Sequence, residues 1–194
     1  MDDSFLDRVC RVADVPGGVL VGHDGSACAQ VALQWAAALA QRAGYDLHVL
    51  RIWDPVSAPR PRTWAAGYVP PLHEWEEAVH DELSTQIAAA GVDPRVAVTC
   101  HVAHGAPAPR LIASAAHADL LVVGSRGRGG LAGLRLGSVS DQCVHHAPCP
   151  VTVVRSGSVR AIPGGHQRGS ATAAVTGPRR RHDDDGAAAG GRGA

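Results

Sequence analysis

The sequence predicts an α/β fold, with a five-stranded parallel doubly wound sheet and helices on both faces. Short apolar segments alternate along the chain with longer helical patterns, as expected where crossover helices join parallel strands. The apolar segments are near-continuous rather than alternating with polar residues, which is typical of strands buried on both faces of a sheet. Ligands of such sheets bind beyond the carboxyl ends of the strands, where the strand order reverses. The loops after the first and fourth strands are therefore the expected place for a site.

The first half of the chain supplies two strands and two helices. An apolar run is closed by Asp24, Gly25 and Ser26, a turn and helix N-cap signal. The Ala-rich segment that follows ends at Gly44, where a helix C-cap belongs. We predict strands at 18–22 and 46–53, helices at 26–43 and 72–90, and a long irregular connection with five prolines at 54–71.

The second half of the chain supplies three strands and two helices. Pro107 and Pro109 fit the first turn of a helix, where a missing amide hydrogen costs little. A glycine-rich loop separates the fourth strand, which is fully apolar, from the last helix. We predict strands at 95–102, 119–123 and 150–154, a helix that begins near Pro107, and a helix at 138–146.

The formal charge is zero, so the total charge favours neither nucleic acid nor a membrane surface as a partner. The types of basic residue also exclude two classes of protein. All 18 basic residues are arginine. A Walker A phosphate loop and a Schiff-base enzyme both depend on a lysine, and both are excluded.

The chain divides into an arm at 1–15, one domain at 16–156 and a tail at 157–194. The tail is rich in Gly, Ala and charge and has few large apolar residues. Such a segment cannot bury enough apolar surface to offset the entropy of ordering it, so we expect disorder.

We expect a cytoplasmic protein with reduced thiols. The start of the chain is acidic and lacks the pattern of a signal peptide, and no apolar run is long enough to cross a membrane. The five cysteines are an odd number at scattered spacings, which favours free and mostly buried thiols.

The loop after the fourth strand carries the most informative chemistry. Gly124 and Gly127 let the backbone turn out of the strand and approach a ligand without a Cβ in the way. Gly137 and Ser138 then begin a helix, whose free N–H groups and positive dipole end suit phosphate oxygens. Arg126 and Arg128 can supply the positive charge that the missing lysine does not.

This loop resembles that of the universal stress protein family. ATP-binding members carry Gly, two residues, Gly, nine residues, Gly, then Ser or Thr, and here Gly124, Gly127, Gly137 and Ser138 have that spacing. The segment 21–26 at the first strand adds to the likeness, which covers about residues 17–155. The resemblance implies a Rossmann-like fold related to the adenine nucleotide alpha hydrolases, and ATP, with or without Mg²⁺, as the ligand.

The resemblance also implies roles for individual residues. Asp24 would contact the adenosine part, and Ile52, at the end of the second strand, would line the adenine. Val123 and Gly124 would flank the base and ribose, and the phosphates would meet backbone N–H groups beyond them. The predicted binding residues are Gly22, Asp24, Ile52, Val123, Gly124, Arg126, Gly127, Arg128, Gly137, Ser138 and Val139.

Each of these interpretations has a structural alternative. Asp24 can serve only to cap a helix, and loop arginines are usually solvated. Cys143, His146 and Cys149 have types found at zinc sites, but Cys143 falls on the core face of its helix, so we predict no metal site. His23 should point away from Asp24 in extended chain, and we expect it to have little effect.

The sequence therefore predicts an ATP-binding regulatory protein with a role in the stress response and no catalytic residue. Its last strand, at 151–154, is expected to pair two subunits as a homodimer, and a further protein partner is unknown. Two alternatives stay open: a slow ATPase or phosphotransfer enzyme that uses the same pocket, and a purely protein-binding fold whose pocket is vacant or holds a different adenosine compound.

Overall fold

The computed structural model describes residues 10–129 and 136–157, so residues 1–9 of the predicted arm and 158–194 of the predicted tail lie outside it. Five parallel strands form one sheet in the order β3-β2-β1-β4-β5. They are β1 (Val19–Gly22), β2 (Leu47–Trp53), β3 (Val98–His104), β4 (Leu120–Gly124) and β5 (Val151–Val154). The predicted five-stranded parallel sheet is confirmed.

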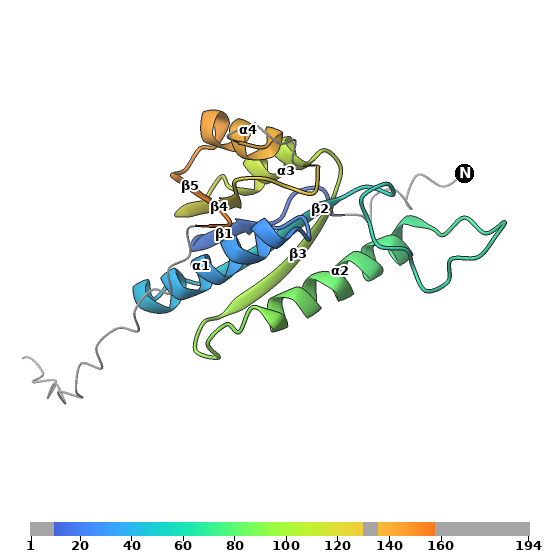
Figure 1. Ribbon diagram of the computed structural model, residues 1–194, viewed down its shortest axis with the longest axis horizontal. Helices are drawn as coiled ribbons and strands as arrows, with labels where there is room; N and C mark the ends of the chain where they lie inside the picture. The colour runs from blue at the N-terminus through green and yellow to red at the C-terminus, as the bar shows by residue number, and fades with distance from the viewer. Residues whose placement is uncertain (1–9, 130–135, 158–194) are drawn as a thin grey trace, which may run out of the picture. The chain divides into compact units, whose positions relative to one another are not determined.

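The strand order reverses beside β1, because β2 and β3 extend the sheet to one side and β4 and β5 to the other. In Figure 1, α1 and α2 lie on one face of the sheet and α3 and α4 on the other. These helices are α1 (Ala27–Ala43), α2 (Leu72–Ala89), α3 (Pro107–Ser114) and α4 (Ser138–His146). The doubly wound arrangement is thus also confirmed, and its crevice lies between the carboxyl ends of β1 and β4.

Helix α1 begins and ends where the sequence signals predict. The Ser26 hydroxyl accepts a hydrogen bond from the Ala29 N–H at 3.1 Å, and Gly44 ends the helix with φ 74°. The small side chains on the inner face of α1 (Ala32, Ala36 and Ala40) are fully buried against the sheet. They let the helix backbone approach the sheet closely, which matters at the start of α1, beside the end of β4.

The third strand is displaced from its predicted range of 95–102 and runs from Val98 to His104. The cause is Asp93, whose carboxylate accepts hydrogen bonds from the Arg95 N–H at 2.9 Å and from its guanidinium. A hydrogen bond from the Val96 N–H to the Asp93 carbonyl closes the turn. Extended structure begins only after this turn and continues until His104 pairs with Trp53.

The segment before β1 packs against α3. Ala13 and Val15 are buried in the core between the sheet, α3 and α4, and the Ser114 hydroxyl accepts a hydrogen bond from the Ala13 N–H at 3.0 Å.

At the other end of the described chain, β5 forms an edge of the sheet, and its pairing with a second copy stays a prediction. In the described residues, no helix combines the length and apolar character that a membrane crossing requires.

Candidate functional site

A cavity of about 430 Å³ lies at the carboxyl ends of β1, β2 and β4. All eleven residues predicted from the sequence to bind nucleotide line this one cavity. They come from three separated stretches of the chain, 22–24, 52 and 123–139, so the fold brings together what the sequence only suggested. Lining a cavity does not test binding, and their roles as ligands of a nucleotide stay predictions.

Gly124, the last residue of β4, and Gly127 lie where there is little room for a side chain. A Cβ on Gly124 would lie 3.0 Å from the Cys28 carbonyl carbon and 3.1 Å from the Ala29 nitrogen, at the start of α1. A Cβ on Gly127 would collide with the Asp24 carboxylate. Neither glycine has a positive φ, so these positions need space rather than an unusual backbone conformation. The result is a loop whose main chain forms the cavity wall.

The N-terminus of α4 faces the same cavity. Gly137 is the N-cap residue and has no side chain with which to cap the helix. Its own N–H is bound to the Ser125 carbonyl at 2.8 Å, and the Ser140 hydroxyl donates to the Gly124 carbonyl at 2.6 Å, which fixes α4 against the end of β4. The first-turn amides, Ser138 and Val139 among them, have no acceptor within the helix by helix geometry. This end of α4 is therefore a ready donor set for an anion.

Asp24 joins the two loops that the sequence singled out. Its Oδ1 accepts a hydrogen bond from the Ser26 N–H at 3.0 Å, which shapes the turn before α1. Its Oδ2 accepts one from the Arg128 N–H at 3.0 Å, across more than a hundred residues of chain. The helix N-cap is Ser26, so Asp24 does more than end a turn: it holds the loop after β4 against the loop after β1.

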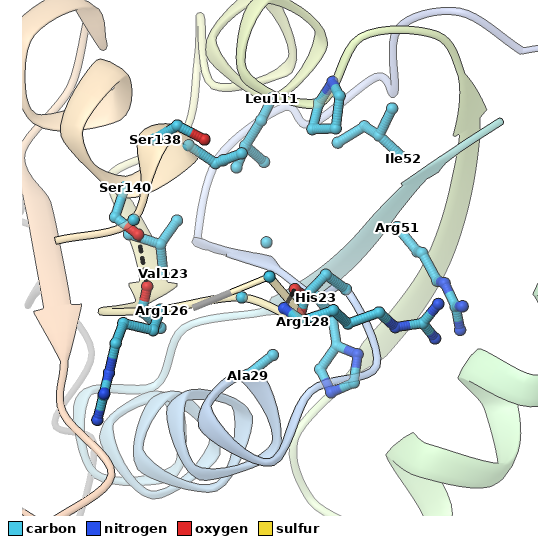
Figure 2. A pocket seen from close by; sticks show the side chains of 18 of the residues that line it. His23, Ala29, Arg51, Ile52, Leu111, Val123, Arg126, Arg128, Ser138 and Ser140 are labelled. Carbon is cyan, nitrogen blue, oxygen red and sulfur yellow. Dashed lines mark hydrogen bonds between the residues drawn. The ribbon is translucent and has the colours of Figure 1, made fainter. Parts of the chain in front are cut away.

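Apolar side chains line another part of the cavity. Figure 2 shows Ile52, Leu111 and Val123 around one region, and Val139 also lines the cavity. Leu111 packs so closely that a Cβ on Gly22 would lie 2.6 Å from its Cδ2 atom. A cavity with an apolar region and a few convergent donors is the usual form of a site for a small organic ligand.

The two loop arginines point in different directions. In Figure 2, Arg126 extends away from Arg128, whereas Arg128 reaches towards His23 and Arg51. The Arg128 Nη1 donates a hydrogen bond to the Ser57 carbonyl at 2.6 Å, and its Nη2 lies 3.7 Å from Glu82 Oε1. Within this structure, Arg128 binds protein groups on the far side of the loop.

Sequence reasoning missed Arg51, the most unusual residue of the cavity wall. It lies in the middle of β2 and its side chain is only 2% exposed. Its Nη1 is 3.1 Å from Glu82 Oε2, yet within the described residues neither terminal nitrogen has a hydrogen bond of good geometry. Burial lowers the pKa of this guanidinium, and Glu82 acts against that shift. A charged residue inside the apolar run 47–53 is the signal that could have found it.

His23 was expected to have little effect, but it is buried and lines the cavity. Its Nδ1 accepts a hydrogen bond from the Gly25 N–H at 3.2 Å, and its Nε2 lies 3.2 Å from Gln30 Oε1. These partners require a neutral ring with the proton on Nε2, because Nδ1 must accept. Burial lowers the pKa of His23 below its ordinary value.

We predict that His23 makes the fold less stable as the pH falls below about 6.5, the ordinary pKa of histidine. Because the folded-state pKa is lowered, the unfolded chain binds the proton more readily, and the free energy of unfolding decreases through this range. Burial shifts His101 in the same direction, so His23→Gln should reduce the slope without removing it. Urea unfolding between pH 7.5 and pH 5 (roughly the range where His titrates) measures it, with exposed His117→Gln as the control that keeps the wild-type slope. An unchanged slope in His23→Gln would contradict this account.

Other cavity residues were also missed, and most are apolar or small. No sequence signal marks them as ligand contacts, since each is equally suited to a core position. Among the described residues, those that line the cavity outside the predicted eleven are His23, Ala29, Leu50, Arg51, Ser57, Pro107, Leu111, Gly129, Leu136 and Ser140. In the described part of the chain, no group of three or more His, Cys, Asp or Glu side chains could hold a metal ion.

Comparison with known proteins identifies the family. The model of the universal stress protein family matches residues 18–155, which include every strand and helix of the sheet. The chain belongs to the universal stress protein family. This result agrees with the resemblance carried by the glycine spacing of the loop after β4.

Several universal stress proteins of mycobacteria are similar in sequence. One from Mycobacterium tuberculosis is 34% identical over 146 residues, covering 72% of this chain and 48% of that protein. Another, from Mycolicibacterium smegmatis, is 40% identical over 144 residues, covering 71% of this chain and 45% of that protein. This chain thus spans about half the length of the curated relatives that it matches.

Solved universal stress proteins share the fold. UspA from Lactobacillus plantarum is 25% identical with a TM-score of 0.53, and the match covers 74% of this chain and 99% of that one. A universal stress protein in complex with cAMP is 27% identical with a TM-score of 0.50, again covering 74% and 99% of the two chains. One structural neighbour in the family therefore holds an adenine nucleotide.

Proposed function

We propose that this universal stress protein is a regulatory module that binds an adenine nucleotide, ATP in the first place, in the cavity at the carboxyl ends of β1, β2 and β4. The observation that carries the proposal is the uncapped N-terminus of α4 at Gly137, which faces a cavity with an apolar region. An anion-binding end beside an apolar region matches a molecule with a phosphate chain at one end and a flat base at the other.

The residues present fit the parts of ATP. Ile52 and Val123 offer apolar surface for the base. The Asp24 carboxylate is an acceptor, as ribose hydroxyls require. Gly127, Ser138 and Val139 would receive the phosphates through N–H groups and the Ser138 hydroxyl. Gly137, whose own N–H is bound to the Ser125 carbonyl, would leave the main chain of this turn uncovered by a side chain. Mg²⁺ would enter with the phosphates.

The comparison with the cAMP complex supports the ligand class but leaves the phosphate count open. We favour ATP because Gly124, Gly127, Gly137 and Ser138 have the spacing of the ATP-binding members of the family. Regulation, rather than catalysis, is proposed because the histidine of the cavity wall, His23, already has both ring nitrogens engaged by Gly25 and Gln30.

Calorimetric titration tests the proposal. ATP, AMP, cAMP and adenosine are titrated separately into the folded protein with Mg²⁺, after native mass spectrometry has shown that no nucleotide co-purified. We expect saturable binding of ATP with micromolar affinity and weaker binding of adenosine. If none of the four binds, the proposal is wrong and the protein-binding alternative leads. ADP that forms in proportion to the protein would favour the slow ATPase.

A further inference from the structure

Arg128 connects three parts of the molecule through its backbone N–H and its side chain. Its backbone N–H donates to Asp24, in the loop after β1, at 3.0 Å. Its Nη1 donates to the Ser57 carbonyl, in the connection between β2 and α2, at 2.6 Å, and its Nη2 pairs with Glu82 of α2. The guanidinium also packs over Gly25, where a Cβ would lie 2.5 Å from Nη2. One residue of the predicted phosphate loop is thus attached to the far wall of the cavity.

Glu82 is shared between two arginines of very different character. Its Oε2 pairs with Arg51 at 3.1 Å, and its Oε1 pairs with Arg128 at 3.7 Å. The Arg51 side chain is 2% exposed, whereas that of Arg128 is 45% exposed. Separating Glu82 from Arg51 would leave a buried charge without a partner, which is costly. The Arg128 pair is long and half-exposed, so it contributes little to stability.

A phosphate in the loop would compete for Arg128 and not for Arg51. Guanidinium–phosphate pairs are charge-assisted, can form two parallel hydrogen bonds and are stronger than an exposed pair with one carboxylate. Arg128 directly follows Gly127 in the loop and is exposed enough to turn. Arg51 would keep Glu82 and α2 in place when Arg128 leaves.

The Arg128 bond to Ser57 attaches a small turn to the loop after β4. Asp54 accepts hydrogen bonds from the Val56 and Ser57 N–H groups at 3.0 and 2.7 Å, and its carbonyl accepts one from the Ala58 N–H at 2.9 Å. The Val56 side chain is 95% exposed, so this turn has little core packing of its own. Its attachment to the loop after β4 is made through Arg128.

We propose that Arg128 is a phosphate-responsive latch. A ligand phosphate at the start of α4 draws the guanidinium away from Ser57 and Glu82, and the turn at 54–58 is released from the cavity wall. The surface that changes is this turn, because Trp64 and Tyr68 of the connection beyond it contact Trp75 and Glu74 of α2. The latch rests on the proposed function, because it requires a ligand with a phosphate in this cavity.

Amide hydrogen exchange of the full chain tests the latch. The amides of Val56, Ser57 and Ala58 are measured in the wild type alone, with saturating ATP, and with saturating adenosine, which has no phosphate. These amides stay bonded to Asp54, but the turn should open more readily once the charge-assisted bond to the Ser57 carbonyl is lost, so we expect ATP to speed their exchange about tenfold. Adenosine should leave the exchange unchanged.

Two variants make the test specific. In Arg128→Gln these amides should exchange at the fast rate without ligand, and ATP should add no further change. Arg95→Gln removes an exposed arginine that pairs with Asp93 elsewhere, and it should behave as the wild type. If ATP binds and the exchange at 54–58 does not change, the latch is wrong and the proposed function stands. If ATP does not bind, the proposed function fails. Slow exchange of these amides in Arg128→Gln without ligand would mean that the Arg128 bond to Ser57 does not restrain the turn, and the latch would be wrong.

Discussion

Replacing Gly137 by aspartate is expected to weaken ATP binding about a hundredfold or more, because a carboxylate at close range would repel the phosphates. The substitution should leave the fold intact. Gly137 has no positive φ, and a Cβ there would meet its nearest neighbour, the Arg126 Cα, at an ordinary 3.5 Å. Calorimetric titration gives the affinity, and thermal unfolding checks the stability.

Gly137→Ala is the matched control, since it adds the same Cβ without a charge. It should bind ATP within about threefold of the wild type, a difference under 1 kcal/mol. Equal binding by the aspartate variant and the wild type would mean that the phosphates do not lie at the start of α4. Equal loss in both variants would mean that the Cβ, and not the charge, blocks the site.

Replacing Glu82 by alanine is expected to lower the free energy of unfolding by about 3 kcal/mol. The loss comes from Arg51, which would be left inside the protein without a charged partner. We place the value at the lower end of the range for broken buried pairs, because Glu82 itself is 32% exposed and water can reach its position. Urea unfolding at neutral pH measures the change.

A double variant tests whether the loss of stability comes from leaving the Arg51 charge buried without its partner. Arg51→Met with Glu82→Leu removes both charges and should cost far less than Glu82→Ala alone. Arg95→Ala breaks an ion pair of 2.9 Å whose arginine is 80% exposed, and it should change the stability by under about 1 kcal/mol. A Glu82→Ala variant as stable as Arg95→Ala would contradict the assignment of Arg51 as a buried charge that depends on Glu82.

The fold could be predicted from the sequence because its signals are local. Ser26 and Gly44 bound α1 by their own chemistry, and the apolar runs of β1 and β4 need no distant partner to be seen. The predicted start of β3 was wrong, because the side chain of Asp93 keeps the chain in a turn that the apolar pattern does not reveal. Local signals thus give the elements, and side-chain hydrogen bonds adjust their ends.

The site was predictable only in part, for a related reason. Its glycines are recognisable from their spacing in the sequence, and close packing leaves little room for a Cβ at Gly124 and Gly127. Arg51 and His23 could not be assigned, because their roles depend on Glu82 and Gln30, which α2 and α1 bring to them. Side-chain contacts between different helices and strands decide which polar residue of a strand faces the cavity. A single sequence does not show which residues make these contacts.

The central claim is that the phosphates of an adenine nucleotide bind at the loop after β4 and the start of α4. Nuclear magnetic resonance of the ¹⁵N-labelled protein, titrated with ATP, tests it most directly. We predict the largest amide shifts at Gly127, Gly137, Ser138 and Val139, and a smaller shift at these amides with adenosine. Saturable shifts confined to another part of the molecule, or no shift at these four amides with ATP in excess, would contradict the claim.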